Sequence, residues 1–262
     1  MKPEADFNFR FSGIARLYGQ QGLERLRNSH AAVIGVGGVG SWVAEALARS
    51  GVGTITLVDL DDVCVSNVNR QLHALDGEIG KPKVVSMASR IRAINPECIL
   101  HEQHMFFNEQ TAPELLSMGY DVVIDAIDVV IKKCQLIVEC KMRGIPVVVM
   151  GSAGGRRDPT RVKKVDLARS FDDPLLKKVR KRLRQRHRFP RNPRKKWHIS
   201  CVFSDEPMVY PQADGTVCKT LTPDTNLKLD CASGYGTASF VTGTFGFVAA
   251  AEAINILTAD VV

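Results

Sequence analysis

The sequence predicts an α/β protein whose core is a doubly wound, mainly parallel sheet. Between residues 31 and 150, short apolar and β-branched runs alternate with segments whose apolar residues recur at helical spacing. Such alternation is typical of parallel strands joined by crossover helices. Apolar residues make up 45% of the 262-residue chain and charged residues 24%, which is ordinary for a globular protein and excludes a disordered or fibrous one.

The first expected strand and helix meet at a glycine-rich turn. Residues 31–34 form a short apolar run that stops at glycines. Residues 41–50 follow, with Val43, Ala46 and Leu47 as the apolar side of a helix. We therefore expect a strand, a glycine turn and a helix in this order.

The alternation continues to residue 150 and then stops. We expect a strand at residues 54–58, a helix at 81–94, a strand at 99–100, and buried strands at 122–126 and 145–150 with a helical segment between them. Gly151, Gly154 and Gly155 then predict a flexible loop, and residues 202–203 and 208–210 predict short strands. We expect a single domain over residues 1–262, with a nucleotide-binding half at 10–152 and a C-terminal elaboration at 153–262.

The glycine turn has the spacing of a phosphate-binding loop. Gly35, Gly37 and Gly40 form G-x-G-x-x-G directly after the first strand, where backbone amides and a helix N-terminus favour phosphate. Asp59 closes the second strand 19 residues after Gly40, where a carboxylate accepts hydrogen bonds from ribose hydroxyls. This context favours a Rossmann-like nucleotide site over a purely structural tight turn.

The residues after Asp59 favour ATP over a dinucleotide. Asn67, Arg70 and Gln71 follow the second strand, and Lys83 lies at the start of the next helix. Hydride transfer does not need this polar and cationic set, whereas cleavage at the α-phosphate does, because negative charge develops on the phosphate oxygens. The alternative for Arg70 and Lys83 is an ordinary surface charge.

Asp128 is the candidate magnesium ligand. It follows the expected strand at residues 122–126 by two residues, which brings it to the carboxyl edge of the sheet. The alternative for Asp128 is a helix N-cap.

Positive charge is concentrated in one segment. Residues 174–196 hold 12 of the 35 basic residues and no acidic residue, so the rest of the chain is net acidic. Leu175, Val179 and Leu183 recur every four residues and predict a helix with outward-facing cations, followed at 191–197 by an extended basic strand whose Trp197 stacks a base. This composition predicts docking of a nucleic acid; a solvated charge run and an anionic-membrane contact are the alternatives.

The cysteines and the apolar C-terminal segment bear on location. The seven cysteines include no C-x-x-C pair, and we find no cleavable signal sequence, so we expect a reducing, cytoplasmic setting without a four-cysteine zinc site. Residues 234–251 carry no charge, but they are rich in glycine, serine and threonine and precede Glu252. We expect a buried core helix here, with a membrane span as the alternative.

The motifs GVGGVG, LVDLDDV, SNVNRQ, GKPKV, INPE and DAID, in this order and spacing, resemble the ThiF, MoeB and HesA adenylating family over residues 10–152. The resemblance implies Mg²⁺-dependent use of ATP, with Arg70 and Lys83 catalytic and Asp128 binding the metal. The implied ATP-binding residues are Gly35, Gly37, Gly38, Gly40, Asp59, Asp61, Asn67, Arg70, Gln71, Lys83 and Asp128.

Two departures from the family pattern concern the partner subunit and the metal site. The family is homodimeric, and an N-terminal R-x-x-R motif there reaches the partner's ATP. This chain has Arg10 but Gly13, so either Arg10 or Arg16 reaches the partner's ATP in place of the missing arginine, or no residue does. Val129 also stands where many members have asparagine.

The C-terminal half resembles one branch of that family. Together with SGIARLYG near the start of the chain, its segments GSAGG, CVFSDE, VYPQADGTVC and DCASGYG look like those of enzymes that use ATP to cyclise threonylcarbamoyl adenosine in tRNA. The implied reaction is dehydration through an acyl-adenylate of the threonyl carboxylate, and intramolecular attack by the carbamoyl group then closes the ring.

Cys231 aligns with the family's catalytic cysteine, although direct ring closure needs no thioester. Adenylation of a ubiquitin-like sulfur-carrier protein is the main alternative function, disfavoured by the missing zinc cysteines. The sequence supports an NAD-dependent oxidoreductase or a non-catalytic nucleotide-binding module even less. It leaves open whether a sulfur-transfer partner protein docks on this chain.

Overall fold

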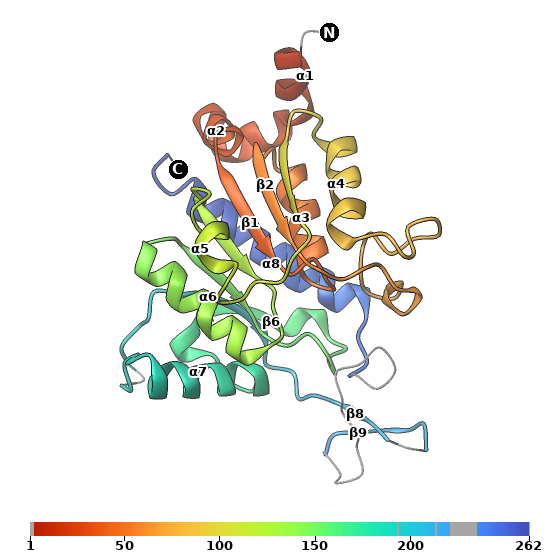
Figure 1. Cartoon of the computed structure of the whole chain (residues 1–262), viewed down its shortest axis with the longest axis vertical. Helices are drawn as coiled ribbons and strands as arrows, with labels where there is room; N and C mark the ends of the chain where they lie inside the picture. The colour runs from red at the N-terminus through yellow and green to blue at the C-terminus, as the bar shows by residue number, and fades with distance from the viewer. Residues whose placement is uncertain (1–2, 193, 213, 221–234, 262) are drawn as a thin grey trace.

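The computed structural model describes residues 3–192, 194–212, 214–220 and 235–261, and it confirms the expected fold class (Figure 1). Within these residues, seven strands form one sheet in the order β3-β2-β1-β4-β5-β7-β6. The strands are β1 (His30–Ile34), β2 (Thr54–Val58), β3 (Ile99–Gln103), β4 (Val122–Asp125), β5 (Val147–Met150), β6 (Val162–Asp166) and β7 (Ser200–Ser204). All neighbours are parallel except β6, which runs antiparallel to β7.

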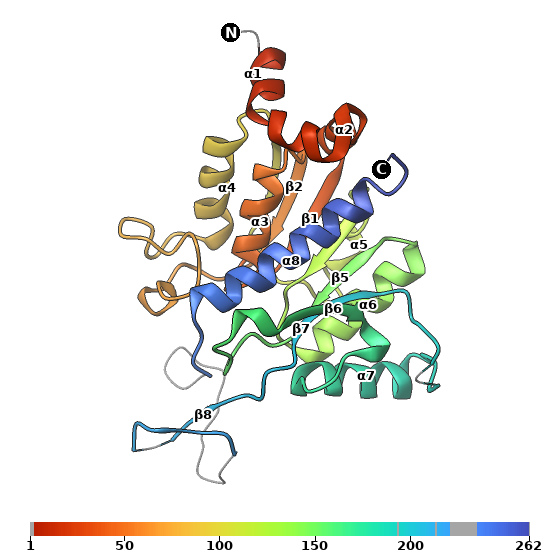
Figure 2. The same ribbon diagram turned by 180° about the vertical axis from the view of Figure 1, so that it is seen from behind.

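Helices cover both faces of the sheet. They are α1 (Pro3–Arg10), α2 (Ser12–Arg27), α3 (Gly40–Arg49), α4 (Lys83–Ile94), α5 (Ala112–Leu115), α6 (Val130–Arg143), α7 (Pro174–Arg186) and α8 (Ser239–Leu257). Helices α5, α6 and α7 lie on the face seen in Figure 1, and α3, α4 and α8 lie on the face seen in Figure 2. Short 3₁₀ turns are η1 (Val65–Asn67), η2 (Pro159–Arg161) and η3 (Leu167–Arg169), and β8 (Tyr210–Pro211) pairs with β9 (Val217–Cys218) outside the main sheet.

Two cores form because alternate residues of each strand point to opposite faces. In β1, Ala31 and Val33 join the cluster under α3, α4 and α8, whereas Ala32 and Ile34 join the cluster under α6 and α7. The inner strands are therefore apolar at nearly every position, as expected for a sheet covered on both sides.

The order of the strands brings the polar loops to one edge. The chain runs outward from β1 through β2 to β3, and it then returns to β4 on the other side of β1. The carboxyl ends of β1, β2, β4, β5 and β7 all lie at the same edge because these strands are parallel. The crevice between β1 and β4 is the place where nucleotides bind in open sheets of this kind.

Helix α8 packs across the sheet beside α3 (Figure 2). It begins at Ser239, which is five residues after the start of the uncharged segment 234–251 in which the sequence predicted a core helix. Val241, Phe245, Ala249 and Ala253 are fully buried along it. Among the described residues α8 is the one helix long and apolar enough to cross a membrane, and 61% of its apolar window is buried inside the protein.

The basic segment differs from the expectation in two respects. Helix α7 ends at Arg186, and its buried residues are Leu176, Val179 and Leu183, with Leu175 only partly covered. The described residues of the range 191–197, which exclude residue 193, do not form the expected strand. Trp197 is 2% exposed, packs at 4.7 Å and 66° on Phe189, and donates its ring N–H to the Pro190 carbonyl. The expectation that Trp197 stacks a base is therefore wrong, because its ring fills the core.

Close packing of α8 on α3 predicts different effects at two glycines one turn apart. A Cβ on Gly246 would lie 2.5 Å from the Cβ of Trp42, whereas one on Gly243 would meet the Trp42 ring at an ordinary 3.5 Å. We expect Gly246→Ala to lower the free energy of unfolding by about 1–3 kcal/mol through overpacking. The matched control, Gly243→Ala, should be neutral or stabilising by up to about 1 kcal/mol, since alanine favours the helix. Urea unfolding of both variants measures the difference, and equal stability would contradict this account of the packing.

Candidate active site

The glycine loop after β1 is closed by contacts that leave no room for a side chain. A Cβ on Gly40 would lie 1.8 Å from the carbonyl oxygen of Gly35, and one on Gly35 would lie 2.9 Å from the carbonyl oxygen of Ala126. Gly35 also has a φ of +94°, which favours glycine. The loop therefore turns tightly between β1 and β4, and α3 begins at Gly40 with its N-terminus at the crevice.

Asp59 ties the end of β2 to the glycine loop. One carboxylate oxygen accepts the backbone N–H of Val36 at 2.7 Å, and the other accepts the N–H of Asp61 at 2.9 Å. Burial raises the pKa of Asp59, while the nearby charge of Lys83 and these two N–H donors oppose the rise. Each oxygen keeps a further lone pair, so Asp59 retains the capacity to accept hydrogen bonds from a ligand.

Lys83 is a buried cation at the same edge. Its side chain is 8% exposed, and its ammonium group lies 2.7 Å from the carboxylate of the exposed Asp61. A buried lysine held beside only one solvent-facing carboxylate can exchange that partner for a phosphate oxygen. Its position at the first residue of α4 follows from the Pro82 N-cap.

The segment after η1 supplies the other expected polar groups. Asn67 is buried, and its side-chain oxygen accepts the N–H of Cys64, so this residue shapes the turn. Arg70 lies across the loop: a Cβ on Gly38 would be 3.6 Å from its Cγ, and its guanidinium donates to the Ser66 carbonyl at 2.6 Å. The structure thus brings Arg70 close to the glycine loop, and Asn67 shapes the turn that precedes Arg70.

Two buried polar side chains behind this segment carry atoms without hydrogen-bond partners. Gln71 Oε1 and both ring nitrogens of His73 accept or donate no hydrogen bond within the described residues. Gln71 faces the loop, because a Cβ on Gly37 would lie 3.9 Å from its Nε2. Unpaired buried polar groups are rare in native proteins and indicate a missing polar ligand or water. These unused hydrogen-bonding atoms, together with the open space beside the backbone of Gly37, therefore fit a bound nucleotide.

A buried ion pair holds the loop that carries Asp128. Lys133 of α6 lies 2.9 Å from the carboxylate of Asp125, with both side chains fully buried. Asp125 also accepts the N–H of Ile127, and burial raises its pKa while Lys133 lowers it. This pair was not expected from the sequence; its signal was a second aspartate before Asp128, at the end of an apolar strand.

Asp128 itself is exposed and free to take a ligand. The N-cap residue of α6 is Val129, with no capping side chain, so Asp128 is not the N-cap. It follows the carboxyl end of β4, next to the Ala126 carbonyl that touches Gly35. A carboxylate at this position, beside a phosphate-binding loop, is suited to Mg²⁺.

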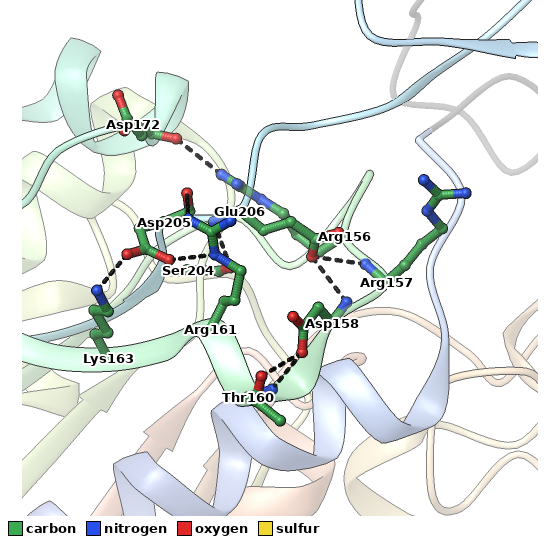
Figure 3. Close-up of polar contacts among 10 residues, drawn as sticks. All are labelled: Arg156, Arg157, Asp158, Thr160, Arg161, Lys163, Asp172, Ser204, Asp205 and Glu206. Carbon is green, nitrogen blue, oxygen red and sulfur yellow. Dashed lines mark hydrogen bonds and ion pairs between the residues drawn. The ribbon is translucent and has the colours of Figure 1, made fainter.

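The loop after β5 adds a buried arginine to the same edge (Figure 3). Arg156 is 1% exposed, donates from Nη2 to the Asp172 carbonyl at 3.0 Å, and leaves Nε and Nη1 without partners. Burial lowers its pKa, against the attraction of Asp173 and other nearby carboxylates. A guanidinium with two unused donors can bind an anionic or carbonyl group of a second substrate.

Acidic residues after β7 brace this loop. Glu206 accepts the backbone N–H groups of Arg157 and Asp158, each at 2.9 Å, and Asp205 pairs with Arg161 and Lys163. In Figure 3 the side chain of Arg157 points away from that of Arg156. The two segments therefore hold Arg156 inward through backbone contacts, while Arg157 remains exposed.

The remaining expected residues lie apart from these loops or outside the described residues. Cys231 falls outside the described residues. Arg10 pairs with Asp6 on α1, and Arg16 is exposed on α2. Four of the described cysteines, Cys98, Cys134, Cys140 and Cys201, are buried, and burial raises the pKa of each thiol. These four are core residues and poor nucleophiles.

Comparison with known proteins agrees with this geometry. A protein-family model described as the ThiF family matches residues 12–261. The tRNA threonylcarbamoyladenosine dehydratase of Escherichia coli strain K12 is 49% identical over 251 residues, which cover 95% of this chain and 94% of that protein. The crystal structure of the E. coli enzyme TcdA in complex with ATP matches with a TM-score of 0.86 and 44% identity, covering 97% of this chain and 95% of that chain.

Sulfur-carrier adenylating enzymes are more distant. The molybdopterin-synthase adenylyltransferase of Salmonella typhimurium strain LT2 is 33% identical over 135 residues. That match covers 52% of this chain and 54% of the other protein.

The buried His73 predicts a pH-dependent stability. Burial and the charge of Lys83 lower its pKa from 6.5 to about 4, so the folded state holds it neutral. A lowered pKa gives stability that is present above pH 6.5 and is lost as the pH falls toward 4. We expect wild type to lose about 2 kcal/mol more than His73→Gln between pH 7 and pH 5, measured by urea unfolding. The exposed His187→Gln variant is the control, and the same loss in all three proteins would refute the prediction.

Proposed function

The chain belongs to the ThiF family, and from that membership we propose that it is an ATP-dependent tRNA threonylcarbamoyladenosine dehydratase. The observation that carries the proposal is similarity to such an enzyme over 95% of the chain, whereas the match to the molybdopterin-synthase adenylyltransferase covers 52% of it. The edge of the sheet supports it, since a glycine cradle, a buried lysine and a buried arginine lie on neighbouring loops.

The proposed reaction has two steps at this edge. The threonyl carboxylate attacks the α-phosphorus of ATP, and pyrophosphate leaves. The carbamoyl group then attacks the activated acyl carbon and loses a proton, the ring closes, and AMP leaves with the oxygen that the substrate loses. ATP is thereby converted to AMP and pyrophosphate while the substrate loses the elements of water. Ring closure is fast because the nucleophile belongs to the same molecule.

Each of the expected residues has a role in this scheme. Gly35 and Gly40 close the turn, with the Gly35 N–H bonded to the Val58 carbonyl, and Gly37 and Gly38 present their backbone to phosphate. Asp59 and Asp61 accept from the ribose, and Asp61 orients Lys83. Lys83 and Arg70, with Asn67 and Gln71, stabilise the negative charge that develops on the phosphate oxygens. Asp128 would hold Mg²⁺, which when bound screens the phosphate charges.

The proposal includes three partners or settings beyond ATP. The basic segment 174–196 docks the tRNA, and the exposed lysines of α7 supply part of that surface. A homodimer would let Arg10 or Arg16 reach the partner's nucleotide. We also propose a cytoplasmic location, where the tRNA substrate is found, and that α8 serves as a core helix.

The adenylation step predicts a defect in rate at two cations. Arg70→Ala and Lys83→Ala should lower kcat by on the order of 100-fold, with a smaller change in ATP affinity, because each cation stabilises charge in the transition state. Turnover assays with modified tRNA and separate ATP titrations measure the two effects. Lys81→Ala is the control, since Lys81 is exposed and pairs only with Glu78. ADP as the product, in place of AMP, would rule out adenylation.

Cys231 has two possible roles that one variant separates. If a thioester forms, Cys231→Ser should slow turnover strongly while pyrophosphate release in the first turnover continues. If ring closure is direct, the variant should keep nearly full activity. Single-turnover assays that follow pyrophosphate and cyclised tRNA distinguish the outcomes, with the buried Cys201→Ser as a control for loss of a thiol elsewhere.

A further inference from the structure

A cavity of about 660 Å³ lies between the end of α6 and the chain that follows α7. We name it the α6–α7 groove. Its lining residues are Val138, Lys141, Met142, Arg186, His187, Arg188, Phe189, Pro190, Lys195, Lys196, Trp197 and His198. The volume is within the range of small-molecule sites, which is about 300–1,000 Å³.

The charge of the groove has one sign. Five lining residues are lysine or arginine, two are histidine, and none is acidic. Arg186, Lys195 and Lys196 are exposed, so their charges face solvent and are not used in ion pairs among the described residues. This concentration attracts an anion and repels a cationic partner.

The floor of the groove is apolar and rigid. Phe189 and Trp197 are buried against each other, and Lys141 lies 5.7 Å above the Phe189 ring and donates to the Trp197 carbonyl. Met142 on α6 is 69% exposed at the rim, beside the exposed His187. Phe189 and Trp197 support the groove from inside the core, and its accessible apolar surface comes from Met142, Val138 and Pro190. Accessible apolar side chains beside a cationic rim match a ligand that has a flat apolar part and a phosphate.

Backbone strain is concentrated at this groove. Three described residues other than glycine have positive φ, and two of them, Arg188 at 56° and His198 at 58°, line the groove. Such conformations cost on the order of 1 kcal/mol or more each, and they occur preferentially at ligand-binding sites. The positive φ angles of Arg188 and His198 turn the chain on both sides of Phe189 and Trp197, so the cations of the two segments face the same cavity.

We propose that the α6–α7 groove binds an unpaired nucleotide of the tRNA substrate, with its phosphate on the Arg186, Lys195 and Lys196 cations and its base against Met142 and the partly exposed Val138 and Pro190. The inference rests on the proposed function. The groove lies at the amino end of β5, and α6, with 14 residues, spans about 21 Å from there to the Asp128 loop. A folded RNA that presents one nucleotide to the crevice can therefore present another to the groove. The site is concave, which fits a splayed base better than a flat membrane surface.

The test compares two triple variants that each remove three positive charges. Arg186→Gln/Lys195→Gln/Lys196→Gln alters the groove, and Lys177→Gln/Lys178→Gln/Lys181→Gln alters exposed positions of α7 outside it. We expect the groove variant to bind unmodified tRNA transcript at least about tenfold more weakly than the α7 variant, and to lower the log–log salt slope by about two units. ATP should raise the Tm of both variants as it does for wild type.

A second variant separates apolar contact from charge. Met142→Ala removes the apolar surface under the base without changing charge, and it should weaken tRNA binding about fivefold, whereas Met142→Leu should have little effect. Equal weakening by both triple variants, or unchanged binding in Met142→Ala, would overturn the groove proposal and leave the proposed function intact. Failure of the wild-type protein to bind tRNA would instead refute the proposed function. Loss of binding to phosphatidylglycerol vesicles, with tRNA binding kept, would reassign the groove to a membrane surface.

Discussion

The contact between Gly40 and Gly35 is the constraint on which the site depends. Because the Gly40 Cα faces the Gly35 carbonyl with no room for a Cβ, the chain can pass from β1 into α3 through the short, tight glycine loop at residues 35–39. The N-terminus of α3 then lies at the carboxyl edge of the sheet, where its unpaired N–H groups and positive helix end are available. Asp59 holds the next residue of the loop, Val36, by its backbone N–H, so β2 fixes the shape of the turn.

Buried polar groups in this protein fall into two classes. The Asp125 and Lys133 pair is closed on itself, with both side chains inaccessible, and it holds the loop before α6. Burying such a pair gives little net stability, although removing one partner is costly. In contrast, Gln71 and Arg156 retain unused hydrogen-bonding atoms at the edge of the sheet. Closed pairs such as Asp125 and Lys133 fix the loops around the site, whereas side chains with unused hydrogen-bonding atoms are suited to bind substrates.

The sequence pattern predicted the central strands closely because both faces of the sheet are covered. The run at residues 54–58 coincides with β2, and the strand expected at 122–126 differs from β4 by one residue. Apolar periodicity was less informative near residue 175. Leu175 and Leu176 are adjacent, and the rotation of α7 against α6 decides that Leu176 is buried. Trp197 illustrates the same limit: its neighbours in sequence are cations, whereas its neighbours in space are Phe189 and the Pro190 carbonyl.

The sequence by itself determined the fold class, the glycine loop and the identities of the polar residues that follow each strand, because these depend on local spacing and on residue chemistry. It also identified the basic segment. Only the tertiary structure decided which charges are buried in pairs and which remain available, since Asp125 and Lys133, or Arg156 and Asp172, meet only after packing. The α6–α7 groove is likewise a tertiary feature, because Met142 and Lys196 are 54 positions apart and line one cavity only when α6 and the chain after α7 lie side by side.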